Sequence, residues 1–229
     1  MPTHLITGAG SGIGAALARR LHDRGDRLVL LARSEERAAE LAVDFSDAAT
    51  LVADLADPAD LERRLAEAEL PERIDSVLHV AGAVELSAVA DLPVDQLREQ
   101  LDVNLVAPAV LTRACLPALR RAQGTVLFVN STSGLRANPA WAAYAASKFG
   151  LRGFADALRA EEAEHGVRVT SVFPSRTATP MQEKVHGQEG KEYDASAWIT
   201  PETVADAIVH VLGLPREATI PELVVKVAR

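Results

Sequence analysis

The sequence predicts an α/β fold in which a doubly wound parallel sheet of about seven strands carries helices on both faces. Short apolar segments alternate with longer amphipathic ones along the chain, as in repeated βαβ units. The apolar runs at 27–32 and 75–80 are nearly continuous, which is typical of strands buried on both sides. The first apolar run leads directly into a glycine-rich turn and a helical pattern, and right-handed crossovers then give the doubly wound topology.

The strands are expected at 3–7, 27–32, 49–53, 74–80, 124–130, 167–173 and 222–228. Helix boundaries are marked by Gly25 after 12–24, by Pro58 in the first turn of 58–69, and by Thr200 and Gly213 around 202–212. The stretch 94–121 contains Pro108 and Pro117, so it is expected to form two helices or one kinked helix.

Residues 177–199 have the weakest pattern and are expected to form a substrate lid, either as a mobile loop or as short helices. The chain has no Gly/Ser-rich linker, internal repeat or low-complexity segment. We therefore expect residues 1–229 to form a single domain.

Composition and charge argue against several classes of function. With 24 Lys and Arg against 32 Asp and Glu, the formal net charge is −8, which disfavours nucleic acid in the absence of a basic patch. No apolar run is long enough for a membrane span, and no leader precedes the first strand, so we expect a cytoplasmic protein. The single cysteine, Cys115, is expected in a helix facing the core, and the six scattered histidines predict no metal site.

The turn after the first strand has the pattern of a phosphate-binding loop. Its glycines would let backbone N–H groups approach a pyrophosphate at the amino end of the next helix. A purely structural glycine turn is the alternative, but the legible strand before it and helix after it favour a nucleotide site. The expected binding residues are Gly8, Gly10, Ser11, Gly12, Ile13 and Gly14.

The end of the second strand indicates which dinucleotide is bound. NAD-selective proteins of this fold class carry an acid here that binds the ribose hydroxyls, but this chain has Ala32 followed by Arg33. A guanidinium can pair with a 2′-phosphate, so NADP(H) is the preferred cofactor. NAD(H) stays possible, because Arg33 could also be a solvated surface residue.

Tyr144 and Lys148 are four residues apart, which places a phenol and an ammonium on one helix face. The pKa of free tyrosine, about 10, is too high for efficient proton transfer at neutral pH. A neighbouring cation is expected to lower it. Ser131, thirteen residues upstream, leaves the fifth strand at the cofactor-facing edge of the sheet.

These motifs together resemble the short-chain dehydrogenase/reductase family, whose sheet is of the Rossmann type. The resemblance covers essentially the whole chain, and it rests on the glycine turn, the Ser131/Tyr144/Lys148 spacing and five further short motifs. These are Asp54-Leu55, Ala81-Gly82, Leu101 to Asn104, Phe173-Pro174, and Thr179 to Met181. The implied reaction is hydride transfer between a nicotinamide and a carbonyl or alcohol.

The resemblance also implies roles for individual residues. Tyr144 is expected to act as acid/base, Lys148 to bind the ribose, Ser131 to orient the carbonyl, and Asn104 to support a proton-relay water. Ser133 is the alternative to Ser131, and Asn104 could instead only shape a helix. The remaining cofactor contacts would come from Asp54 at the adenine, where an unliganded loop aspartate is the alternative, and from Leu55, Ala81, Gly82, Pro174, Thr177 and Thr179.

Two segments depart from the family pattern. His79-Val80 replaces the usual Asn-Asn before Ala81-Gly82, so a side-chain hydrogen bond near the fourth strand should be missing. Ser175 replaces the usual glycine after Pro174 and is followed by Arg176. This change could alter the substrate mouth or be a tolerated turn.

The main alternative function is a non-catalytic NADP-binding sensor or regulator on the same fold, which would be expected to lose the tyrosine or lysine. An epimerase or dehydratase of the extended relatives would need a longer substrate domain. In the lid, Met181, Val185, Tyr193 and Trp198 could form an apolar pocket wall or a mixture of hinge and surface.

The partner expected from the resemblance is a small carbonyl or alcohol. Trp141 and Phe149 are expected to serve packing or subunit contact. A homotetramer or homodimer through the helices at 94–121 and 141–164 is also implied.

Overall fold

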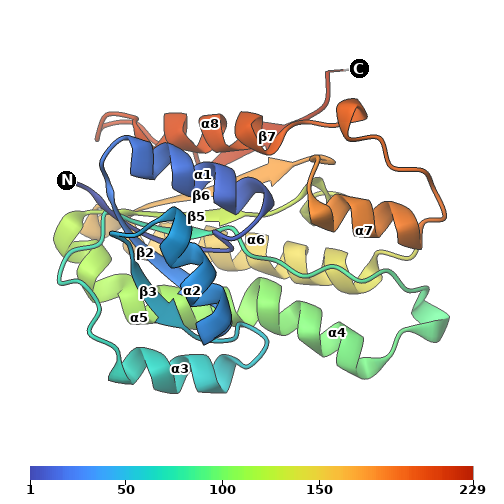
Figure 1. Ribbon diagram of the computed structural model, residues 1–229, viewed down its shortest axis with the longest axis horizontal. Helices are drawn as coiled ribbons and strands as arrows, with labels where there is room; N and C mark the ends of the chain where they lie inside the picture. Colours follow the sequence, from blue (N-terminus) through green and yellow to red (C-terminus); the bar gives the residue numbers. More distant parts are fainter. Residues whose placement is uncertain (229) are drawn as a thin grey trace.

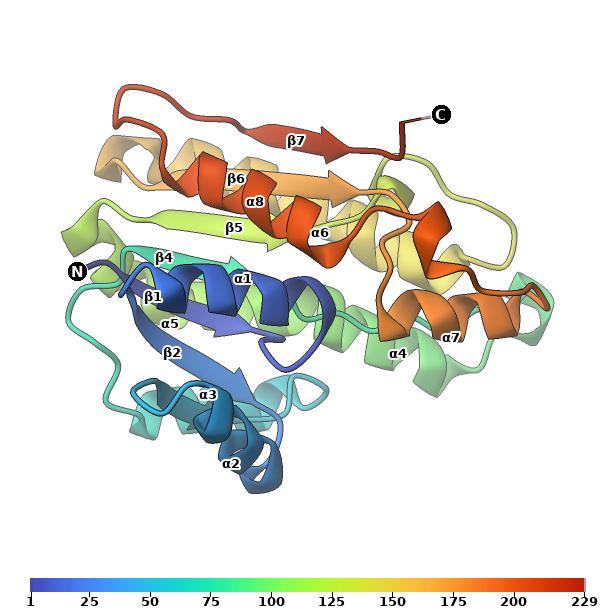
Figure 2. The same cartoon turned by 45° about the horizontal axis from the view of Figure 1, so that its top comes forward.

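A parallel sheet of seven strands in the order β3-β2-β1-β4-β5-β6-β7 forms the centre of the computed structural model, which describes residues 1–228. The chain winds outward from β1 to one edge and from β4 to the other, so the predicted doubly wound fold is confirmed (Figure 2). The strands are β1 (Thr3–Thr7), β2 (Arg27–Ala32), β3 (Ala49–Val52), β4 (Ser76–His79), β5 (Thr125–Val129), β6 (Arg168–Pro174) and β7 (Glu222–Val225).

Helices cover both faces of the sheet, and a separate helix lies beyond the carboxyl ends of the strands (Figures 1 and 2). One face carries α1 (Gly12–Asp23), α2 (Glu35–Asp44) and α8 (Pro201–Leu212), and the other α3 (Pro58–Glu67), α4 (Val94–Leu101), α5 (Ala107–Ala122) and α6 (Ala142–Glu162). The helix beyond the strand ends is α7 (Pro180–Gln188).

The central strands are buried because both of their faces contribute to a core. Successive residues of β1 alternate between the two: Leu5 packs in the cluster beneath α5, and Ile6 in the cluster beneath α1 and α8. The edge strand β7 ends at Val225, three residues earlier than expected, after pairing with β6 over four residues.

Side-chain caps fix the start of several helices. Asp57 accepts a hydrogen bond from the Asp60 amide at the start of α3, and Thr200 caps α8 in the same way. Each cap is followed by a proline at the first helical position, which confirms the predicted starts. Thr179 begins α7 by the same device, so the 177–199 region contains a short helix.

The stretch 94–121 divides into α4 and α5, which agrees with the first of the two expectations, two helices. The division is a wide π-helical turn at Asp102–Val106 rather than a break at a proline. Length and composition alone would allow the run Val94–Ala122 to cross a membrane. Leu111, Cys115 and Leu119 are nevertheless fully buried against the sheet, so the run is a core segment.

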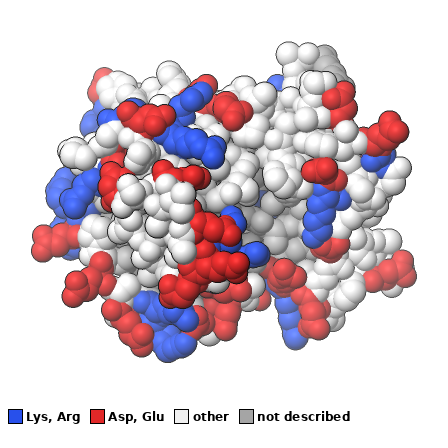
Figure 3. All heavy atoms as spheres, viewed as in Figure 1, with Lys and Arg blue, Asp and Glu red and all other residues white. Residues whose placement is uncertain are grey.

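Charged side chains of both signs are interspersed over the face shown in Figure 3. Basic and acidic groups alternate there without an extended basic area, which is consistent with the net charge of −8. The face therefore offers no continuous phosphate-binding surface.

Candidate active site at the carboxyl ends of the strands

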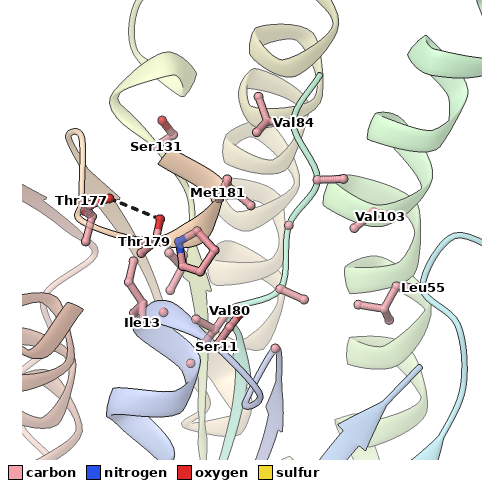
Figure 4. Close-up of a pocket in the computed structure, with 18 of the residues that line it drawn as sticks. Ser11, Ile13, Leu55, Val80, Val84, Val103, Ser131, Thr177, Thr179 and Met181 are labelled. Atoms are coloured by element: carbon pink, nitrogen blue, oxygen red, sulfur yellow. Dashed lines mark hydrogen bonds between the residues drawn. The ribbon is translucent and has the colours of Figure 1, made fainter. Parts of the chain in front are cut away.

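One elongated cavity of about 790 Å³ brings together nearly all the predicted site residues. It runs along the carboxyl ends of the strands, where doubly wound sheets bind their ligands. Figure 4 shows Ile13 and Thr179 on one side of this cavity, with Leu55 and Val103 on the other. Asn104 is the one predicted residue that does not line it; those that do are Gly8, Gly10, Ser11, Gly12, Ile13, Gly14, Arg33, Asp54, Leu55, Ala81, Gly82, Ser131, Tyr144, Lys148, Pro174, Thr177 and Thr179.

The glycine turn is packed so closely that side chains would not fit. Gly8 has φ +77°, and a Cβ there would lie 2.8 Å from the Ala81 nitrogen. A Cβ on Gly14 would collide with the Gly8 carbonyl. The turn thus leaves a bare backbone cradle at the amino end of α1, which fits the pyrophosphate of a dinucleotide.

The loop after β4 is held by Thr7 in place of the missing asparagine. The Thr7 hydroxyl accepts hydrogen bonds from the amides of Val80 and Ala81, both at 3.1 Å. His79 is buried, stacks on Phe128 at 4.8 Å and hydrogen-bonds to the Thr112 hydroxyl at 2.8 Å. The departure from the family pattern therefore leaves this loop anchored.

Tyr144 and Lys148 lie on one face of α6, as their spacing predicts, and both side chains are buried. The Lys148 Nζ lies 5.7 Å from the centre of the Tyr144 ring and donates a hydrogen bond to the Val129 carbonyl at 3.0 Å. The two groups therefore meet at the end of β5.

The expected direction of the Tyr144 pKa is wrong. Burial raises the pKa of Tyr144 to about 12, and the effect of the Ser131 side chain opposes this only in part. Burial also lowers the pKa of Lys148 to about 8. Removing both groups from water disfavours their charged forms, and this outweighs any help that the ammonium gives to a phenolate.

Ser131 lies at the turn after β5 and lowers the pKa of Tyr144. Its Oγ also accepts a hydrogen bond from the Ser133 amide at 3.0 Å, which fixes the turn after β5. Ser133 lines the cavity as well, but of the two serines only Ser131 affects the pKa of Tyr144. The choice of Ser131 over Ser133 stays a prediction.

Asn104 lies in the π-helical turn, buried behind the cavity wall. Its side chain accepts a hydrogen bond from the Ala83 amide and donates one to the Ala83 carbonyl, both at 2.8 Å. It also donates to the Ser147 hydroxyl at 3.0 Å. Asn104 thereby joins the loop after β4 to the helix that carries Tyr144 and Lys148.

Comparison with known proteins decides the family. A family model described as short chain dehydrogenase matches residues 2–190. The chain belongs to the short-chain dehydrogenase/reductase family. It is accordingly an NAD(P)-dependent oxidoreductase.

Individual relatives of this short-chain dehydrogenase match it over almost its full length. An uncharacterized oxidoreductase of Staphylococcus epidermidis is 32% identical over 225 residues, 97% of this chain and 95% of its own. An alcohol dehydrogenase from Thermococcus sibiricus complexed with 5-hydroxy-NADP has a TM-score of 0.86 at 25% identity, covering 98% and 96% of the two chains. A short chain dehydrogenase from Escherichia coli CFT073 complexed with NADPH has a TM-score of 0.88 at 26% identity, covering 97% and 95%.

Arg33 and Asp54 line the end of the cavity that lies near β2 and β3. Arg33 is exposed, and the Asp54 carboxylate accepts a hydrogen bond from the Ala56 amide at 2.9 Å, which holds Asp54 in a tight turn. A second guanidinium, which sequence reasoning missed, lies beside them. Arg37 lines the cavity, and its Nη2 would be 2.5 Å from a Cβ on Gly10. Its spacing of four residues from Arg33, at the start of a helix capped by Ser34, is the signal that could have identified it.

The region 177–199, predicted to be a substrate lid, contributes both to the cavity wall and to the packing behind it. Met181 and Val185 line the cavity, whereas Tyr193 and Trp198 pack against His186 behind it. Trp141 lines the cavity and also packs edge-on against Tyr144, with ring centres 5.7 Å apart.

Ser175 both lines the cavity and holds the last strand. Its amide donates to the Val225 carbonyl at 2.8 Å, and its hydroxyl accepts from the Val227 amide at 3.2 Å. The replacement of glycine at this position therefore adds a hydrogen bond to the chain beyond β7.

Proposed function

We propose that this short-chain dehydrogenase interconverts a carbonyl and an alcohol with NADP(H), and that Tyr144 transfers the proton. The observation that carries the proposal is that Ser131, Tyr144 and Lys148 line the same cavity as the glycine cradle. A bound nicotinamide dinucleotide would supply or accept the hydride. The protein supplies the position of the substrate and the proton.

Tyr144 and Ser131 are suited to bind one oxygen atom. Each hydroxyl can donate and accept a hydrogen bond, so together they can hold a carbonyl or alcohol oxygen at the cavity wall. With a pKa of about 12, Tyr144 is a protonated donor at neutral pH, as carbonyl reduction requires. Burial at 7% exposure also keeps competing water away from the phenol.

Lys148 is proposed to bind the ribose next to the nicotinamide and to hold a positive charge near the phenol. Its hydrogen bond to Val129 leaves two of its three N–H donors for other acceptors. Asn104 is proposed as a positioning residue, because it connects the Ala83 backbone to Ser147 beside Lys148. Asp54 and Leu55 are proposed to border the adenine.

The proposed preference for NADP(H) rests on two guanidinium groups at the adenosine end. Arg33 and Arg37 both line the cavity there, and guanidinium groups pair well with a phosphate. The solved relatives whose descriptions mention NADP or NADPH support the same choice.

A cytoplasmic homodimer or homotetramer is the proposed assembly. Phe149 on α6 is 43% exposed, and Val106 beside α5 is 38% exposed. These side chains lie on the helices expected to meet in a subunit contact. Light scattering during size-exclusion chromatography would measure the mass of the particle.

The test of the proposed reaction uses both tyrosines of the chain. Tyr144→Phe should lower kcat for aldehyde or ketone reduction about 10²- to 10⁴-fold, with NADPH affinity unchanged in a fluorescence titration. Tyr193→Phe, at a residue that packs against His186 and does not line the cavity, is the matched control and should keep wild-type kcat. NADPH binding without turnover of any carbonyl or alcohol would instead favour a sensor.

A further inference from the structure

Arg176 is a positive charge at the catalytic end of the cavity that none of the roles above uses. It lies between β6 and α7 and lines the cavity. Three other cations of the described chain line the same cavity: Arg33 and Arg37 near the end of β2, and Lys148, which is buried and bonded to Val129. Arg176 is thus the cation available to a substrate beside the lid.

Two indole rings hold the Arg176 guanidinium in place. Its Cζ lies 5.9 Å from the centre of Trp141 and 5.5 Å from that of Trp198, both within the range of a cation–π contact. Trp141 also contacts the Tyr144 ring, with centres 5.7 Å apart. The guanidinium and the phenol therefore contact the same indole, which places a positive charge one ring away from the proton donor.

Most of the hydrogen-bonding capacity of Arg176 is unused. Its Nη2 donates to Glu189 at 2.6 Å, and within residues 1–228 no other side-chain hydrogen bond of Arg176 is present. An arginine has five N–H donors. Glu189 also pairs with Lys191 at 3.1 Å, so two cations share one carboxylate and the group keeps a net positive charge.

We propose that the substrate is a carbonyl compound that carries a carboxylate, and that Arg176 binds this carboxylate while the carbonyl lies at Tyr144. This inference rests on the proposed carbonyl chemistry. A guanidinium binds a carboxylate through two parallel hydrogen bonds, and the fixed Arg176 lowers the cost of ordering it. Because an indole separates the two groups, oxo acids with several bonds between carboxylate and carbonyl fit better than 2-oxo acids.

The first test measures binding without any need for turnover. Trp141 and Trp198 are the only tryptophans in the chain, and both contact Arg176. Titrating 4-oxopentanoate into the enzyme with NADP⁺ present should therefore change the fluorescence saturably, and methyl 4-oxopentanoate should not match it. Arg176→Met should remove the response to the acid, and Arg176→Lys should retain part of it.

The second test separates KM from kcat. Arg176→Met should raise KM for reduction of 4-oxopentanoate about 10- to 100-fold, while kcat/KM for the methyl ester changes less than about 3-fold. Lys191→Met is the matched control: it removes a cation from the same carboxylate, but Lys191 is exposed and does not line the cavity. It should leave KM for the acid near the wild-type value.

Each outcome of these two tests supports or overturns the binding of a substrate carboxylate by Arg176. Equal losses for acid and ester in Arg176→Met would make Arg176 a support for the lid and overturn the inference. Equal affinity of the wild type for acid and ester would also overturn it, with the proposed carbonyl reduction intact if Tyr144→Phe still abolishes turnover of the ester. Saturable binding of the acid without turnover of either compound would support the anion site and count against the proposed reaction.

Discussion

The side chain of Asn104 pairs with the backbone of Ala83 in both directions, accepting from its amide and donating to its carbonyl at 2.8 Å. One turn earlier, Gln100 forms the same reciprocal pair with the backbone of Glu85. Two amide side chains therefore attach the loop after β4 to the α4 and π-helical segment. They differ in that Asn104 also reaches Ser147, on the helix of Tyr144.

We predict that Asn104→Ala lowers both stability and activity. Leaving the partly buried Ala83 backbone groups without their Asn104 partner should cost about 1–3 kcal/mol in the free energy of unfolding, measured by urea denaturation. kcat/KM should fall because Ala83 and Ser147 lose their shared anchor. Gln100→Ala is the matched control, with a similar loss of stability and a smaller loss of activity. Equal effects on activity would assign Asn104 a purely structural role.

The second prediction concerns cofactor selectivity. Arg33→Ala and Arg37→Ala should each weaken NADPH binding about 10- to 100-fold, because a hydrogen bond to a charged group contributes about 1.5–3 kcal/mol, and should change NADH binding little. The exposed Arg19 on α1 does not line the cavity, so Arg19→Ala is the control. If the wild type bound NADH more tightly than NADPH, the proposed preference for NADP(H) would be wrong.

The third prediction concerns acid sensitivity. Burial lowers the pKa of His79 to about 3, against about 6.5 in an unfolded chain. Below pH 6.5 the unfolded state therefore binds a proton that the folded state does not. The free energy of unfolding accordingly decreases as the pH is lowered. The titration of His79 alone should lower the free energy of unfolding by about 1.4 kcal/mol when the pH is lowered from about 7.5 to 5.5.

His79→Asn should remove that part of the pH dependence, as measured by urea unfolding at the two pH values. Burial also lowers the pKa of His4, which adds a loss of the same sign that the variant retains. His210→Asn, at an exposed position of α8, is the control. An unchanged pH dependence in His79→Asn would contradict the prediction.

The fourth prediction follows from the raised pKa of Tyr144, about 12. Carbonyl reduction uses the protonated phenol, so kcat/KM should be nearly constant from about pH 6 to 7 and should change above about pH 8, where Lys148 loses its charge. Alcohol oxidation uses the phenolate, whose fraction grows tenfold per pH unit below the pKa. Ser131→Ala removes the side chain that lowers this pKa and should slow oxidation at a given pH. An oxidation rate independent of pH would contradict this account.

The sheet and most of the cavity lining could be predicted because their signals are local in sequence. Apolar strands such as 75–80, and the glycines around Gly10, identify themselves within a few residues. Parallel strands then bring distant segments to one edge. This is why Thr179 and Ser131, far apart in sequence, line one cavity.

Other properties depend on packing and could not be predicted in this way. The position of Arg37 over Gly10 depends on the direction in which α2 leaves the sheet. The pKa of Tyr144 rises because burial outweighs the effect of its neighbour, and burial is a property of the whole fold. The π-helical turn at Asn104 carries no proline or glycine that would have marked it.

The two hydrogen bonds of Ser175 to the chain around β7 have a practical consequence. The peptide that follows β7 is attached directly to a residue of the cavity wall, whereas the amino end of β1 lies at the other end of the strands, away from their carboxyl ends (Figure 2). An affinity tag or immobilising linker added after β7 would pull on the catalytic end. The same addition before β1 would leave that end undisturbed.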